Sequence, residues 1–120
     1  MRHISIRGVT YRLNAVERDG QWVARAEREE NGRPFGAEYG GATETAALDG
    51  LSQWLEWQDE HQKALEALQA AERAYHRAIA GSAFANAEEE PAAGELRKES
   101  LDALEIARIR LDEVRNRKPQ

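Results

Sequence analysis

The chain has 120 residues, about the length of one domain, and 21 of its hydrophobic residues are alanine, so we expect a thin core and no large buried active-site cavity. Its net charge of −5 is concentrated in residues 43–90, which carry three basic and ten acidic residues, and this pattern disfavours nucleic acid as the main ligand. The chain has no cysteine, which excludes disulfides and thiol nucleophiles, and no run of about 18 apolar residues, so we expect a cytoplasmic protein without a membrane span.

The first 41 residues alternate between apolar and polar side chains and contain three dipeptides typical of tight turns. These dipeptides are Arg7-Gly8, Asp19-Gly20 and Asn31-Gly32. Both central positions of a type I′ hairpin turn need a positive φ, which Gly, Asn and Asp tolerate best. The spacing therefore predicts a four-stranded antiparallel meander.

Each two-residue turn also predicts a strand register. The turn at residues 19–20 places Leu13 opposite Ala26, and a turn at residues 31–32 places Ala26 opposite Ala37 and Arg28 opposite Phe35. The registers agree in putting the apolar residues on one face and the cross-strand pairs Arg12–Glu27 and Arg25–Glu38 on the other. The predicted apolar face consists of Ile4, Ile6, Val9, Tyr11, Leu13, Ala15, Trp22, Ala24, Ala26, Phe35, Ala37 and Tyr39.

A long helix is predicted to follow, beginning at an N-cap provided by Thr43 or Thr45 and running to about Ala80. Its apolar residues point in two directions about 120° apart at the 100° per residue of a helix. We interpret this as one helix with two partners: its first half covers the sheet and its second half packs on another helix. The first direction contains Ala47, Leu48, Leu51 and Leu55, and the second contains Ala64, Leu68, Ala71, Tyr75 and Ala78.

Residues 81–94 are predicted to form a loop, and residues 95–117 a last helix that folds back antiparallel to the long one. This register would bring the basic end of the last helix beside the acidic stretch of residues 56–60. The predicted seam of the last helix contains Leu96, Ala103, Leu104, Ala107, Leu111 and Val114.

The predicted fold class is therefore α+β, with a four-stranded antiparallel β-meander covered by a long helix and extended by an antiparallel two-helix hairpin. We expect two parts, residues 1–60 with the meander and the first half of the long helix, and residues 61–120 with the hairpin continuous with it.

Three apolar side chains of the last helix are left over from this hairpin. Leu101, Ile106 and Ile109 project roughly opposite to the seam, and a two-helix hairpin can bury only one stripe per helix. They indicate a dimer or a partner-binding face, unless the stripe rests on the protein's own sheet.

A second candidate face is formed by Trp57 and His61, where the apolar direction of the long helix changes. Aromatic residues there are typical either of core packing or of a recognition hot spot.

The residues that carry catalytic or metal chemistry do not form a recognisable constellation. His61 and His76 lie about 22 Å apart along one helix, too far to ligate one ion. Glu72 and His76 are four residues apart and offer two ligands at most, a spacing also common on solvated helix faces. We therefore expect no catalytic residues, no metal site and no cofactor, and a non-enzymatic interaction module that binds a protein partner or a second copy.

An alternative function follows from the acidic face of the long helix. Asp49, Glu56, Asp59 and Glu60 would suit a small acidic inhibitor or antitoxin-like regulator that covers a basic site on a nucleic-acid enzyme. Association through these charges would weaken strongly with salt, whereas association through the apolar stripe would not.

The order of features in residues 9–55 resembles the HicB-like antitoxin family. The features are a Gly turn before an aromatic second strand, at Asp19-Gly20-Gln21-Trp22, and a Gly-x-Thr element that opens a helix, at Gly41-Ala42-Thr43. The resemblance implies a partly degraded ribonuclease-H-like fold that binds a partner protein through its sheet and helix, without catalysis. It does not cover the C-terminal helical hairpin.

Overall fold

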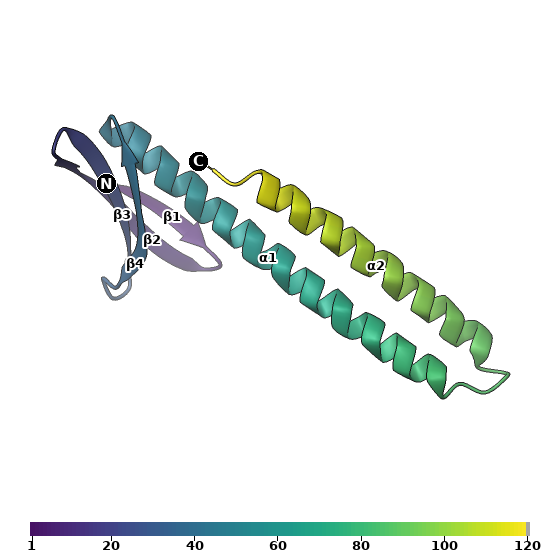
Figure 1. Cartoon of the computed structure of the whole chain (residues 1–120). Coiled ribbons are helices and arrows are strands. Elements are labelled where there is room, and N and C mark those ends of the chain that lie inside the picture. Colours follow the sequence, from purple (N-terminus) through teal and green to yellow (C-terminus); the bar gives the residue numbers. More distant parts are fainter. Residues whose placement is uncertain (120) are drawn as a thin grey trace. The chain divides into compact units, whose positions relative to one another are not determined.

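The computed structural model describes residues 1–119 and contains four strands followed by two helices (Figure 1). The strands form one antiparallel sheet in the order β1-β2-β3-β4, which confirms the predicted α+β meander. The elements are β1 (Arg2–Ile6), β2 (Val9–Arg18), β3 (Gln21–Arg28), β4 (Pro34–Gly41), α1 (Glu44–Ala83) and α2 (Glu90–Asn116).

The described chain divides into two compact units. The sheet unit consists of residues 1–59 together with Lys118 and Pro119, and the hairpin unit consists of residues 60–117. Helix α1 contributes to both, since its first 16 residues (44–59) belong to the sheet unit and the remainder to the hairpin unit.

The first two turns are formed by the dipeptides that predicted them. Arg7 and Gly8 have φ values of 51° and 79°, and Asp19 and Gly20 have values of 53° and 81°. Two consecutive positive φ angles are the signature of the type I′ turn, whose twist matches that of the strands it joins. The β2–β3 register is the predicted one over its whole length, including Leu13 opposite Ala26.

The β3–β4 connection differs from the prediction. Arg28 donates its N–H to the carbonyl of Arg33 (2.9 Å), so the loop has four residues, Glu29 to Gly32, of which only Gly32 has a positive φ. The Asn31 side chain accepts a hydrogen bond from the N–H of Arg33 (2.9 Å), so Asn31 shapes a wider loop rather than a type I′ turn. Ala26 consequently pairs with Phe35, and the predicted pairs Ala26–Ala37 and Arg28–Phe35 are wrong.

A bulge in β4 then restores the predicted register. Ala26 pairs with Phe35 while the adjacent Arg25 pairs with Glu38, which leaves Gly36 and Ala37 as two extra residues on β4. Because side chains alternate with a period of two, a two-residue shift keeps every side chain of β4 on its predicted face.

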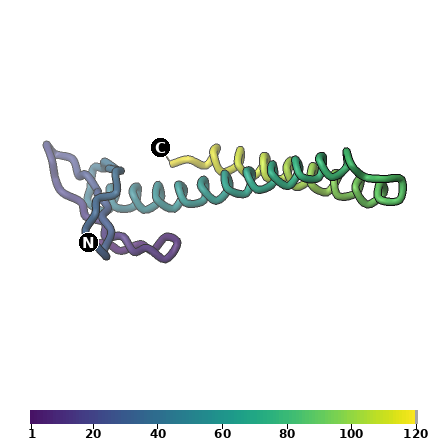
Figure 2. Tube along the Cα trace, turned by 90° about the horizontal axis from the view of Figure 1, so that it is seen from below, coloured from purple at the N-terminus to yellow at the C-terminus, as the bar shows by residue number. Residues whose placement is uncertain are grey.

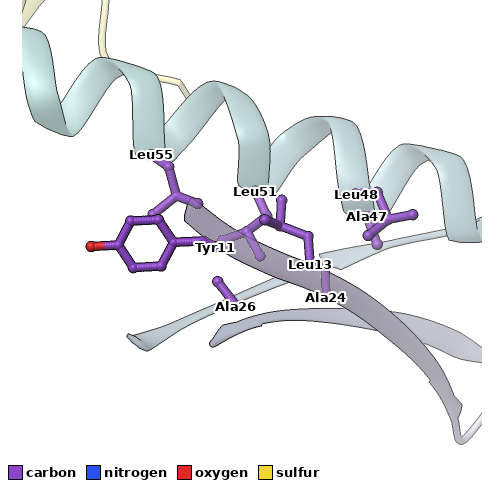
Figure 3. Close-up of a cluster of buried hydrophobic side chains, with 8 residues drawn as sticks. All are labelled: Tyr11, Leu13, Ala24, Ala26, Ala47, Leu48, Leu51 and Leu55. Carbon is purple, nitrogen blue, oxygen red and sulfur yellow. The ribbon is translucent and has the colours of Figure 1, made fainter. Parts of the chain in front are cut away.

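The core of the sheet unit lies between one face of the sheet and the start of α1 (Figure 3). Leu51 and Leu55 point from the helix toward Leu13 and Tyr11 of β2, and Leu13 and Leu51 have no exposed surface. All twelve residues of the predicted apolar face are buried or partly buried in this cluster. The opposite face carries both predicted ion pairs, Arg12–Glu27 at 3.1 Å and Arg25–Glu38 at 2.9 Å.

The start of α1 is defined by a cap and a close approach. The Thr43 hydroxyl accepts a hydrogen bond from the N–H of Ala46 (3.0 Å), which identifies Thr43, the first of the two predicted candidates, as the N-cap. A Cβ on Gly41 would come within 2.6 Å of the backbone N of Ala47, so glycine is required where the sheet passes into the helix.

The hairpin unit consists of the second half of α1 and of α2, which run side by side in Figures 1 and 2. The predicted loop at residues 81–94 is too long, because α1 extends to Ala83 and α2 begins at Glu90. Pro91 lies in the first turn of α2, where its missing N–H costs nothing, and Asn86 accepts hydrogen bonds from the N–H groups of Glu88 (3.0 Å) and Glu89 (2.9 Å) ahead of the helix.

The seam of the hairpin is narrower than predicted. Leu104, Ala107, Leu111 and Val114 are buried on α2, and Ala64 and Ala78 are buried on α1. The other two predicted seam residues are exposed: Leu96 retains 55 % of its surface, and Ala103 also faces solvent. The α1 residues at this end of the hairpin are the small Ala78, Gly81 and Ser82, which leave a hollow that Leu96 lines without filling.

Candidate functional site

The apolar side chains left over on α2 are exposed. Ile106 retains 67 % of its surface, Ile109 59 % and Leu101 37 %. Ile106 and Ile109 line one shallow hollow together with Arg110, Glu113 and Arg117. Leu101 is separated from Ile106 by about 140° around the helix. The structure thus brings two of the three predicted residues into one patch, here called the isoleucine patch, defined by Ile106 and Ile109.

Three of the four residues of the predicted acidic face form ion pairs within the chain. Asp49 binds Arg2 at 2.5 Å and Asp59 binds Arg7 at 2.7 Å, so both pairs join α1 to β1 or to the turn that follows it. Glu60 lies 3.8 Å from Arg117, which is the predicted contact between the acidic stretch and the basic end of the last helix. Glu56 is exposed on α1. The pairing leaves less unbalanced negative charge on this helix than the sequence suggests.

The two residues of the second candidate face fall in different units. Trp57 belongs to the sheet unit and His61 to the hairpin unit, and both are partly buried. The Lys118 ammonium lies 5.6 Å from the centroid of the Trp57 ring, within the range of a cation–π interaction. Trp57 is therefore part of a contact that sequence reasoning did not predict.

A hollow beside this contact was also missed. It has a volume of about 410 Å³ at the bulge of β4, and it is lined by Gly36, Ala37, Glu38, Tyr39, Leu51, Trp54 and Pro119. Trp54 continues a series of edge-to-face aromatic contacts, since Tyr11 meets Phe35 at 5.5 Å and Phe35 meets Trp54 at 6.4 Å. The sequence alone did not predict this hollow, because Lys118-Pro119 indicates only that a helix ends there.

Among residues 1–119, no three His, Asp or Glu side chains gather in an arrangement that could hold a metal ion. Within the same residues, neither helix combines the length and the apolar character needed to cross a bilayer.

Comparison with family models, with curated proteins and with solved structures gave no match. The likeness of residues 9–55 to HicB-like antitoxins therefore depends on the turn, strand and cap residues alone, and a shared ancestry with that family remains a proposal.

Proposed function

We propose that this protein is a non-enzymatic protein–protein interaction module that associates through its helical hairpin, with a second copy of the chain as the expected partner. The observation that carries this proposal is the isoleucine patch. Ile106 and Ile109 stand one turn apart on the side of α2 away from its buried seam, and each exposes more than half of its surface. Large aliphatic side chains so placed favour a contact with another chain.

The thin core of the hairpin unit is a physical reason for this contact, because association would bury more apolar surface. Its buried hydrophobic residues are three alanines, two leucines and one valine, so the two helices exclude little apolar surface by themselves. Two hairpins that met through the outer sides of their α2 helices would bury apolar surface that each hairpin alone leaves exposed.

The energetics favour a dimer of moderate affinity. Complete burial of an isoleucine side chain contributes about 1.5–3 kcal/mol, so four partly exposed isoleucines from two copies contribute roughly 4–8 kcal/mol. Association costs an estimated 4–15 kcal/mol in lost freedom of motion. The isoleucines alone therefore cover only the lower part of this cost, and the rest of the α2 surface must add contacts. We expect the dimer to dissociate on dilution.

The experiment is to measure the mass of the chain by light scattering over a dilution series, at low and at moderate salt. The native chain should show a concentration-dependent dimer that persists at moderate salt. The double variant Ile106→Glu/Ile109→Glu should be monomeric and retain its helical ellipticity. Phe84→Glu/Leu96→Glu is the matched control, because it adds two carboxylates at exposed apolar positions elsewhere in the hairpin unit.

Two results would contradict the proposal. One is a native chain that is monomeric at every concentration, and the other is an isoleucine double variant that dimerises as the native chain does. A dimer that disappears between low and moderate salt would favour association through charges, as the acidic-regulator hypothesis requires.

A further inference from the structure

The bulge of β4 builds a groove wall that a regular strand would not provide. Gly36 and Ala37 are the two residues that have no counterpart on β3, and both line the hollow together with Tyr39 and Trp54. β4 is the last strand in the order of the sheet, so no described strand pairs with its outer edge. Bulges at sheet edges commonly re-aim side chains at sites of recognition.

The segment that follows α2 lies against this groove. Pro119 is partly buried and contributes to the lining of the hollow, beside Trp54 and Tyr39. Its neighbour Lys118 places its ammonium 5.6 Å from the ring centroid of Trp57, one turn further along α1. Both residues belong to the sheet unit.

The chemistry of these contacts is that of a peptide-recognition site. Proline disfavours the helical conformation for the residue before it, so Lys118-Pro119 is biased toward an extended chain. Proline segments in this conformation dock on aromatic grooves, and a cation binds the face of an indole.

From these observations we propose that the groove between β4 and α1 is a binding site for an extended peptide segment of a partner protein in which lysine precedes proline. The chain's own Lys118-Pro119 lies against this site when the partner is absent and acts as an intramolecular competitor. A single cation–π contact at an exposed side chain is weak, and tethering supplies an effective concentration in the millimolar range. A partner that also pairs with the backbone of β4 can therefore displace the segment.

The test uses a fluorescent peptide with the sequence of residues 114–120 and measures its binding to the full-length chain by fluorescence anisotropy. The variant Lys118→Ser/Pro119→Ser empties the groove and should bind the peptide at least ten-fold more tightly than the native chain. A peptide with alanine in place of its lysine and proline should bind neither protein. Lys98→Ser, which removes one positive charge from α2, is the control and should bind as the native chain does.

A second variant identifies the site. Trp57→Leu, introduced into the emptied chain, should reduce peptide binding by ten-fold or more while the far-UV ellipticity stays unchanged. Equal binding by the native and emptied chains would overturn the intramolecular competition, and no binding by the emptied chain would overturn the site itself.

Peptide binding by the variant Ile106→Glu/Ile109→Glu distinguishes the groove from the proposed dimer contact. This variant should bind the peptide as the native chain does, because Ile106 and Ile109 belong to the hairpin unit. If Lys118→Ser/Pro119→Ser abolished dimer formation, the segment would bind a second copy, and the proposal that it occupies its own groove would fail.

Discussion

Gly50 of α1 lies directly against the aromatic ring of Tyr39 from β4. A Cβ placed on Gly50 would stand 2.2 Å from Cε1 and 2.4 Å from Cδ1 of that ring. Glycine inside a helix costs stability relative to alanine, and here the cost is offset by a close approach of the helix to the sheet. The position therefore reports how tightly α1 packs on β4.

The first prediction is that Gly50→Ala destabilises the sheet unit by about 1–3 kcal/mol, because the ring must move to admit the methyl group. Gly81→Ala, at the other end of the same helix, should stabilise the protein by up to about 1 kcal/mol, because a Cβ there meets nothing within 4 Å. Urea unfolding followed by tryptophan fluorescence measures the first change, since all three tryptophans lie in the sheet unit. The same unfolding followed by far-UV ellipticity measures the second. In a Tyr39→Ala background the Gly50→Ala penalty should disappear, and its persistence there would contradict the assigned contact.

The second prediction concerns the cap of α1. Thr43→Ala should cost about 0.5–2 kcal/mol, because the N–H of Ala46 loses its acceptor, whereas Thr43→Ser should retain most of the stability. Thr45→Ala lies two residues into the exposed first turn and should cost less than 0.5 kcal/mol, in line with surface substitutions. The measurement is thermal or urea unfolding of the three variants. An equal loss for Thr43→Ala and Thr45→Ala would show that the helix begins elsewhere.

The third prediction concerns the two arginines that attach β1 to α1. Arg7→Gln should cost up to about 1 kcal/mol, and Arg2→Gln should cost less, within the range of ordinary exposed pairs. The difference arises because the Asp59 side chain is only 16 % exposed, against 52 % for Asp49. Both losses should shrink in about 1 M salt, where the screening length falls to about 3 Å. If the arginine substitutions had the same effect at low and high salt, packing rather than charge would be responsible.

The fourth prediction compares two residues two positions apart on α2. Leu111→Ala should destabilise the hairpin unit by about 2–5 kcal/mol, because Leu111 is 3 % exposed. Ile109→Ala should change the stability of the monomer by less than about 0.5 kcal/mol, because more than half of that side chain is already exposed. Far-UV ellipticity during urea unfolding, at a concentration where the chain is monomeric, measures both. A large loss for Ile109→Ala under these conditions would mean that the residue is covered within its own chain.

Much of the sheet unit was predictable because its first two turns leave little conformational choice. Arg7-Gly8 and Asp19-Gly20 define two-residue turns, and their registers place nine of the twelve apolar side chains on one face without adjustment. Asn31-Gly32 is less specific, because asparagine can also shape a longer loop through its side chain, as the hydrogen bond to Arg33 shows. The bulge that compensates for this loop has no signal in the sequence beyond Gly36.

The candidate sites were predictable to different degrees. The exposure of Ile106 and Ile109 follows from helical periodicity, which also identified the four residues that the seam buries. The exposed position of Leu96 could not be predicted, because it depends on where the facing helix carries only small side chains. The groove at β4 depends on an irregular backbone and on Lys118 and Pro119, which lie 60 or more residues from Trp57 in sequence.

The two extra residues of β4 form an insertion that the hydrogen-bonded ladder does not need. If Gly36 and Ala37 were excised, Phe35 would be followed directly by Glu38, and their existing partners Ala26 and Arg25 are already consecutive on β3. The shortened strand would keep its pairing, its alternation and its loop, and it would lose two of the seven residues that line the groove. These two residues can therefore change without a change in the strand pairing on either side of them.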